Sequence, residues 1–86
     1  MRLDIELPDG GCKMGPQAFR EMVQDTFAEM FKGQITDEDL KNDPDEAIKF
    51  CLAVRKRARA RNLPYRVILG TLTNNRKRGN GTALAS

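Results

Sequence analysis

The sequence predicts a small, mainly α-helical domain with one short N-terminal β-strand and three to four helices, two of which form a candidate helix-turn-helix. Two observations support this prediction. Apolar residues recur three and four positions apart over much of the chain, which is the period of an amphipathic helix. Proline residues and a capping-box pattern stand where the helices would begin. All 86 residues are expected to form a single domain, because two domains would leave each without a core.

The first segment, residues 1–14, is expected to be a strand followed by a turn. Apolar residues alternate with charged ones, at Leu3, Ile5 and Leu7. This period of two is typical of a half-buried strand, and the run Pro8–Gly11 would turn the chain. A lone strand needs a pairing partner. The sequence leaves two segments open for that role, residues 12–14 and residues 82–84.

The clearest helix is expected over residues 15–33. Pro16 suits the first helical position, where its missing N–H group costs nothing, and Gly33 suits the C-terminal stop. Apolar residues recur at helical spacing: Phe19, Met22, Val23, Phe27, Met30 and Phe31. A stripe of Met and Phe residues at this spacing is typical of a core rather than of a ligand site.

Residues 36–61 are expected to hold a short helical turn followed by a longer helix with a basic end. Thr36 and Asp39 form a capping-box pattern, and Asp43 followed by Pro44 is a second start signal. Carboxylates in a first turn are favoured by the helix dipole, so capping explains them better than a metal site or acid–base catalysis. The longer helix carries an apolar stripe: Ala47, Ile48, Cys51, Leu52, Val54 and Ala58.

Residues 64–78 are expected to form the candidate recognition helix. Pro64 suits its first position, and apolar residues fall at i, i+3, i+4 and i+7: Tyr65, Ile68, Leu69 and Leu72. The alternative is a strand over residues 65–73 with a turn at Asn74-Asn75, because the segment is rich in β-branched residues and Gly70 weakens a helix. Residues 79–86 are expected to be a flexible tail.

Charge is strongly segregated along the chain. Residues 1–54 carry six basic and twelve acidic residues, a net charge of −6, whereas residues 55–86 carry nine basic and no acidic residues, a net charge of +9. A stretch of 32 residues without a carboxylate indicates an anionic partner such as nucleic acid. The alternative is that the acidic half keeps the protein soluble and pairs with the basic half.

These patterns predict a small nucleic-acid-binding protein with a regulatory or accessory role and with duplex DNA as its target. An inward apolar stripe would turn Arg66, Val67, Gly70, Asn74 and Lys77 outward, towards a groove. Arg66 suits guanine and Asn74 suits adenine, while phosphates would be contacted by Arg57, Arg61, Arg76, Lys77 and Arg78. The candidate binding residues are Arg55, Lys56, Arg57, Arg59, Arg61, Arg66, Gly70, Asn74, Arg76, Lys77 and Arg78. With a strand at residues 65–73, RNA would be as good a candidate as DNA.

A protein-interaction module is the second interpretation, because a chain with oppositely charged halves could dock on an acidic protein or form a homodimer. No enzymatic activity, catalytic residue, metal site or cofactor is expected, since the chain has no His and only Cys12 and Cys51 as thiols. The lack of a long apolar run and of an N-terminal signal pattern predicts a cytoplasmic protein with free thiols and no membrane partner.

Overall fold

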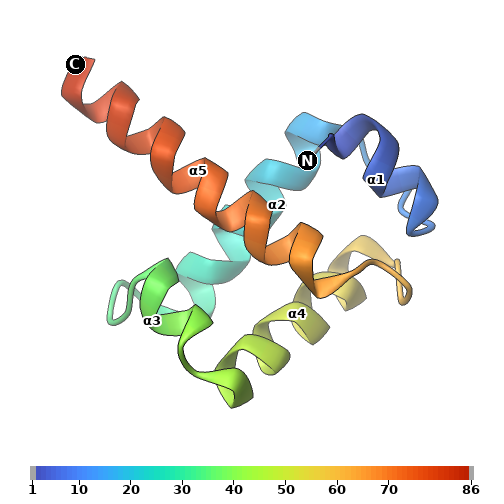
Figure 1. Ribbon diagram of the computed structural model, residues 1–86, viewed down its shortest axis with the longest axis horizontal. Helices are drawn as coiled ribbons and strands as arrows, with labels where there is room; N and C mark the ends of the chain where they lie inside the picture. The colour runs from blue at the N-terminus through green and yellow to red at the C-terminus, as the bar shows by residue number, and fades with distance from the viewer. Residues whose placement is uncertain (1, 86) are drawn as a thin grey trace.

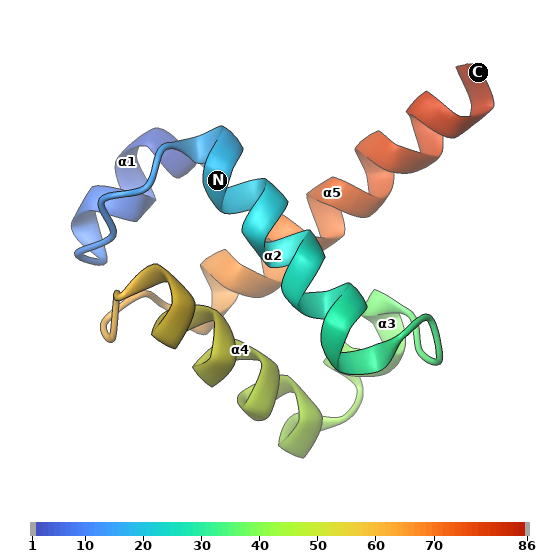
Figure 2. The same ribbon diagram turned by 180° about the vertical axis from the view of Figure 1, so that it is seen from behind.

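The computed structural model describes the backbone of residues 2–85 and the side chains of residues 2–75. All regular secondary structure within that backbone is helical, so the predicted mainly α-helical fold is confirmed. Five helices follow one another along the described backbone: α1 (Leu3–Asp9), α2 (Pro16–Phe31), α3 (Asp37–Lys41), α4 (Pro44–Ala58) and α5 (Tyr65–Ala85) (Figure 1). Helices α2 and α5 cross in the middle of the molecule, with α5 in front in one view and α2 in front in the opposite view (Figure 2).

The predicted N-terminal strand is wrong, because residues 3–9 form helix α1. Leu3 and Leu7 are four residues apart, so a helix places both on one face, and both are buried. Ile5 lies on the opposite side of the helix and remains half-exposed. A strand would have needed a neighbouring strand for its backbone groups, and no segment between residues 2 and 85 provides one.

The predicted helix over residues 15–33 is confirmed as α2. Gly15 is its N-cap and Pro16 takes the first helical position. The helix ends at Phe31, and both Lys32 and Gly33 adopt a left-handed backbone, with φ of 52° and 76°. Two successive left-handed residues end the helix more abruptly than the single glycine stop that the sequence predicts.

Both predicted start signals in the next segment are present. The hydroxyl of Thr36 accepts a hydrogen bond from the amide of Asp39 (3.2 Å), and the carboxylate of Asp39 accepts one from the amide of Thr36 (3.0 Å). This reciprocal pair starts α3. The carboxylate of Asp43 accepts a hydrogen bond from the amide of Glu46 (3.3 Å) and caps α4. These acidic side chains therefore satisfy helix ends, as predicted.

Helix α5 confirms the helical interpretation of residues 65–73, and the alternative of a strand followed by a turn is wrong. The helix contacts α2, α3 and α4, so it is covered over a wide arc. The fully buried side chains of its described part are Val67, Ile68, Thr71 and Leu72. Burial of Val67 contradicts its predicted outward position. Thr71 is accommodated in the core because its hydroxyl donates to the carbonyl oxygen of Val67 (2.7 Å).

The ends of α5 differ from the prediction. The helix begins at Tyr65, one residue after the predicted start, and its backbone continues past Arg78 to Ala85. The side chains of the predicted flexible tail, residues 79–86, lie outside the described residues.

The core lies where α2, α4 and α5 meet. Its largest fully buried side chains are Phe19, Phe50, Leu7, Leu40, Leu63, Ile68 and Leu72. Phe50 of α4 packs edge-on against Phe27 of α2, with ring centroids 5.9 Å apart, a favourable aromatic geometry. The apolar stripe of α2 therefore serves mainly as core, as predicted, although Met30 at its end is exposed.

Candidate nucleic-acid interface

The basic end of α4 is shaped by a helix stop. The helix ends at Ala58 instead of the predicted Arg61, because Arg59 adopts a left-handed backbone with φ of 54°. The following loop, residues 59–64, is anchored by Leu63, which is fully buried. Arg59 and Arg61 consequently stand at the surface on a loop whose far end is fixed in the core.

Arg55, a candidate nucleic-acid-binding residue, forms contacts within the fold. Its Nε donates a hydrogen bond to the carbonyl oxygen of Leu63 (2.8 Å), which secures the loop. Its guanidinium also lies over the ring of Tyr65, 4.3 Å from the centroid, in a cation–π contact. Arg55 therefore joins α4, the loop and the start of α5, and its role in nucleic-acid binding stays a prediction.

Arg57 is also engaged, on another side of α4. Its guanidinium donates to the hydroxyl of Thr26 (3.0 Å) and forms an ion pair with Glu29. Thr26 in turn donates to the carbonyl oxygen of Met22 (2.7 Å), so the buried hydroxyl is satisfied twice. These contacts fasten α4 to α2 and neutralise part of the predicted positive charge.

Among the described side chains, three predicted cations are both exposed and without a salt bridge, and we call them the basic end of α4: Lys56, Arg59 and Arg61. Among the side chains of residues 2–75, none forms a salt bridge with these three. Together with Leu52 and Arg55 they line an open hollow of about 670 Å³. The basic end of α4 therefore presents several positive charges around a concave surface.

The positive surface extends to a residue that the sequence did not indicate. Lys13, in the link between α1 and α2, is exposed and lines a second hollow of about 460 Å³ together with Arg57 and Arg59. Its sequence neighbours are not basic and it lies far from Arg59 along the chain, so only the fold brings the two together.

The outer face of α5 carries part of the predicted recognition stripe. Arg66 and Asn74 are exposed and Gly70 between them is partly exposed, as expected for residues four apart on one face. Arg66 is not free, because its guanidinium lies 3.0 Å from the carboxylate of Glu6. The structure therefore brings Arg66, Gly70 and Asn74 to one face and removes Val67 from it.

Three further predicted residues, Arg76, Lys77 and Arg78, belong to α5, but their side chains lie outside the described residues. Within the described residues, helix α5 therefore contributes Arg66, Gly70 and Asn74 to the candidate interface.

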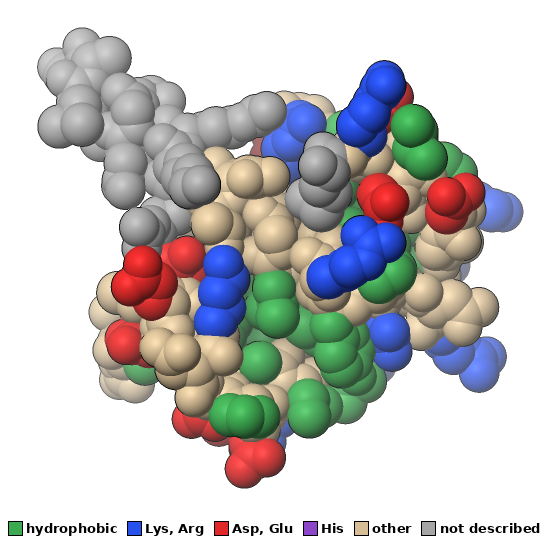
Figure 3. Space-filling view, in the orientation of Figure 1, with side chains coloured by type: hydrophobic (Ala, Val, Ile, Leu, Met, Phe, Trp, Pro, Cys, Tyr) green, Lys and Arg blue, Asp and Glu red, His purple; other side chains and the backbone are tan. Residues whose placement is uncertain are grey.

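The charge segregation of the sequence is only partly visible on the surface. In Figure 3, acidic side chains lie over α3, over the start of α4 and, at the upper right, over α1, whereas most Lys and Arg side chains lie along the right-hand side of the molecule. Hydrophobic side chains gather between them, over α4 and the beginning of α5. The cationic surface therefore borders an exposed apolar one.

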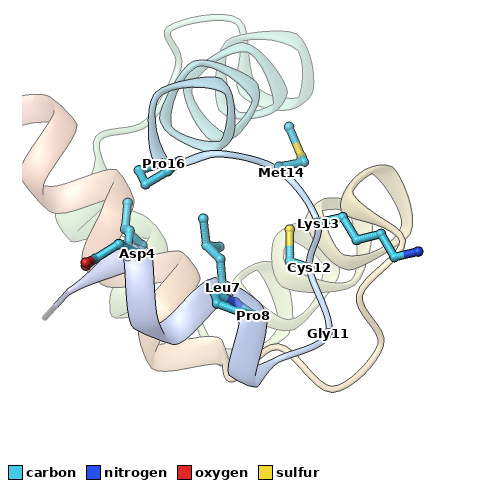
Figure 4. A pocket seen from close by; sticks show the side chains of 9 residues that line it. Asp4, Leu7, Pro8, Gly11, Cys12, Lys13, Met14 and Pro16 are labelled. Atoms are coloured by element: carbon cyan, nitrogen blue, oxygen red, sulfur yellow. The ribbon is translucent and has the colours of Figure 1, made fainter.

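A hollow of about 560 Å³ between α1 and the following link offers no comparable chemistry. The charged side chains of Asp4 and Lys13 point away from it, whereas Leu7 and Cys12 point inward (Figure 4). A binding pocket needs a few convergent polar groups, and this lining has none among the residues shown.

The two cysteines are free and buried. Burial raises the pKa of the Cys51 thiol to about 11, an effect that the nearby guanidinium of Arg55 opposes only in part. A thiol that stays neutral at physiological pH is a poor nucleophile. Cys51 thus serves as a small core residue of α4, in agreement with its predicted place on the apolar stripe.

The chain matches no protein-family model, no curated protein and no solved structure. Within the described part of the chain, none of the helices combines the length and the apolar content that a membrane crossing requires.

Proposed function

We propose that this protein binds duplex nucleic acid through the basic end of α4 and the outer face of α5. The observation that carries the proposal is the exposure of Lys56, Arg59 and Arg61 around one hollow, with no salt bridge to any described carboxylate. Unpaired cations on a fixed surface are suited to phosphates, which supply most of the affinity in nucleic-acid binding.

Within this proposal the residues divide into two roles. The basic end of α4 and Lys13 neutralise phosphates. Arg66 and Asn74, both exposed on the outer face of α5, would contact base edges, guanine and adenine respectively. Arg55 and Arg57 hold the scaffold through Leu63 and Thr26 and take no part in binding.

The helix-turn-helix hypothesis concerns α4 and α5. Six residues, 59–64, separate these helices, which is longer than the three- to four-residue turn typical of that motif. The proposal therefore rests on the exposed cations and on the face of α5, and it does not require a helix-turn-helix docking geometry.

A second candidate function is binding to an acidic protein. It is favoured by Leu52, which is half-exposed and lines the same hollow as Arg59 and Arg61. An apolar side chain among cations is suited to a protein surface and adds nothing to phosphate binding.

The test is fluorescence anisotropy with a labelled duplex of about 20 base pairs, at salt concentrations from about 50 to about 200 mM. The variant Arg61→Glu is compared with Lys32→Glu, which makes the same charge change at the distant end of α2. We expect Arg61→Glu to weaken binding and to lower the slope of log K against log salt by about 0.9, the value for one phosphate contact. Equal effects of the two variants, or no binding by the wild type at low salt, would exclude the proposal and favour the acidic-protein alternative.

A further inference from the structure

The outer face of α4 exposes two large apolar side chains that the fold covers only in part. Ile48 is 45% exposed and Leu52 is 50% exposed. They are four residues apart and therefore lie on adjacent turns of one face. Among the exposed large hydrophobic residues of the described chain, these two alone share a helix.

Charged residues continue this apolar stripe in both directions. Asp45, Ile48 and Leu52 follow the heptad spacing of helices that pair side by side. Arg59 follows Leu52 by seven residues and is the C-cap of α4, directly after the last helical residue. Asp45 and Arg59 are both exposed. The stripe is thus acidic at its start, apolar in its middle and basic at its end.

Leu52 lies midway between Asp45 and Arg59 in the sequence. A two-fold axis that passes through Leu52 perpendicular to α4 therefore relates two antiparallel copies of the helix. Across this axis Asp45 of one copy faces Arg59 of the other, Ile48 faces Lys56, and Leu52 faces Leu52. A two-fold interface requires this kind of self-complementarity, in which residue i meets residue j and residue j meets residue i.

We propose that a second copy of this chain docks on this face, with the two α4 helices antiparallel about a two-fold axis at Leu52. The two Leu52 side chains meet at the centre, and the stem of each Lys56 covers the opposite Ile48. Asp45 of each copy pairs with Arg59 of the other at the two rims. Antiparallel packing also places the acidic first turn of each α4 against the basic last turn of its partner.

The charge pattern of α4 favours a second copy of this chain as the partner, and it favours the antiparallel orientation. A parallel pair would put Asp45 on Asp45 and Arg59 on Arg59, and such like-charge contacts are costly. A polyanion would match Arg59 but would leave Ile48 uncovered and Asp45 repelled. Lys56 and Arg59 also belong to the proposed nucleic-acid surface, so the two functions share two residues but are tested separately.

The expected association is weak, because two half-exposed apolar residues per copy bury less surface than a stable dimer does. The experiment is sedimentation equilibrium of the whole chain, freed of nucleic acid, at low salt and at concentrations up to about 1 mM. We expect a monomer–dimer equilibrium whose dissociation constant rises about ten-fold in either Asp45→Arg or Arg59→Asp, since each change creates two like-charge contacts. The double variant D45R/R59D restores opposite charges and is expected to return the constant to near the wild-type value.

Two matched controls separate pairing from general charge effects. Lys32→Asp makes the same change as Arg59→Asp at another exposed, left-handed residue that ends a helix, and Asp25→Arg changes an exposed acid on α2. Both are expected to leave the dissociation constant unchanged. A wild type that is monomeric throughout, controls that weaken the dimer equally, or a double variant as weak as the single ones would each overturn the proposal.

Discussion

The guanidinium of Arg66 lies 3.0 Å from the carboxylate of Glu6, and this ion pair joins the start of α5 to α1. The glutamate side chain is only 22% exposed, whereas the arginine side chain is 69% exposed. The acidic helix α1 therefore holds the cation that the proposed function assigns to base contact. A nucleic acid that uses Arg66 has to displace Glu6 or accept its negative charge nearby.

Removing this negative charge is expected to strengthen duplex binding. Glu6→Gln releases the guanidinium, and because an exposed ion pair contributes at most about 1 kcal/mol, the affinity should rise about two- to five-fold. Anisotropy with the same labelled duplex measures it. Asp4→Asn is the control, since it removes one charge from the same helix, where Asp4 pairs with Arg2. If Asp4→Asn strengthens binding as much as Glu6→Gln does, the effect is one of net charge and not of this ion pair.

Arg55 is expected to matter for stability through its shape and not its charge. Lysine cannot reproduce both the Nε hydrogen bond to Leu63 and the stacking on Tyr65. Arg55→Lys should lower the free energy of unfolding by about 1–3 kcal/mol. Urea denaturation measures this loss, and the exposed Arg59→Lys should change the value by less than about 0.5 kcal/mol. Similar losses in the two variants would contradict the structural role of Arg55.

Gly10 is expected to tolerate no side chain. A Cβ at this position would lie 2.6 Å from Cδ1 and 3.0 Å from Cα of Leu63, and the backbone contact cannot be relieved by a rotamer change. Gly10→Ala should therefore destabilise the protein by about 1–3 kcal/mol. Thermal unfolding followed by circular dichroism measures the shift, and an unchanged melting temperature would show that α1 does not pack against the loop in this way.

Gly15 offers the opposite case. It is the N-cap of α2, has no side-chain capping bond, and a Cβ there meets no atom within 4 Å. Gly15→Ser adds a hydroxyl that can accept from the first turn, so we expect stabilisation by up to a few tenths of a kcal/mol, the usual difference between Ser and Gly at this position. The same unfolding measurement checks it, and a destabilised variant would contradict the open geometry at this cap.

Cys51 is expected to make stability fall at alkaline pH. Its pKa is about 11 in the folded protein against an ordinary value of 9.0, so folding favours the neutral thiol. This contribution is complete below pH 9.0 and is lost as the pH rises towards 11, at up to about 1.4 kcal/mol per pH unit. Urea unfolding of the wild type and of Cys51→Ala should therefore give free energies that converge as the pH rises above 9.0. A constant difference between the two proteins would contradict the raised pKa.

Local signals in the sequence determined α2, α3 and α4. Pro16, the Thr36–Asp39 box and Asp43 act within one helical turn of their own position, so their effect does not depend on the rest of the fold. For α5, the helical spacing of the apolar residues left a strand open as the alternative, and Pro64 favoured the helix. The set of residues that α5 buries could not be predicted from this spacing. Val67 is buried because α5 contacts α2, α3 and α4, which come from other parts of the chain.

The same division applies to the candidate site. The sequence by itself determined that the cations gather after residue 54, because charge is a property of composition. Only the tertiary structure decided which of these cations form contacts within the fold. Arg55 contacts Leu63 and Tyr65. Arg57 contacts Thr26 and Glu29, and Arg66 forms an ion pair with Glu6. The tertiary structure also decided that residues 3–9 form a helix. Leu3, Ile5 and Leu7 alternate with charged residues, which suits a strand, but Leu3 and Leu7 are also four residues apart, which suits a helix equally well. Each of these outcomes depends on contacts between residues distant in sequence, and such contacts follow from packing and not from any local pattern.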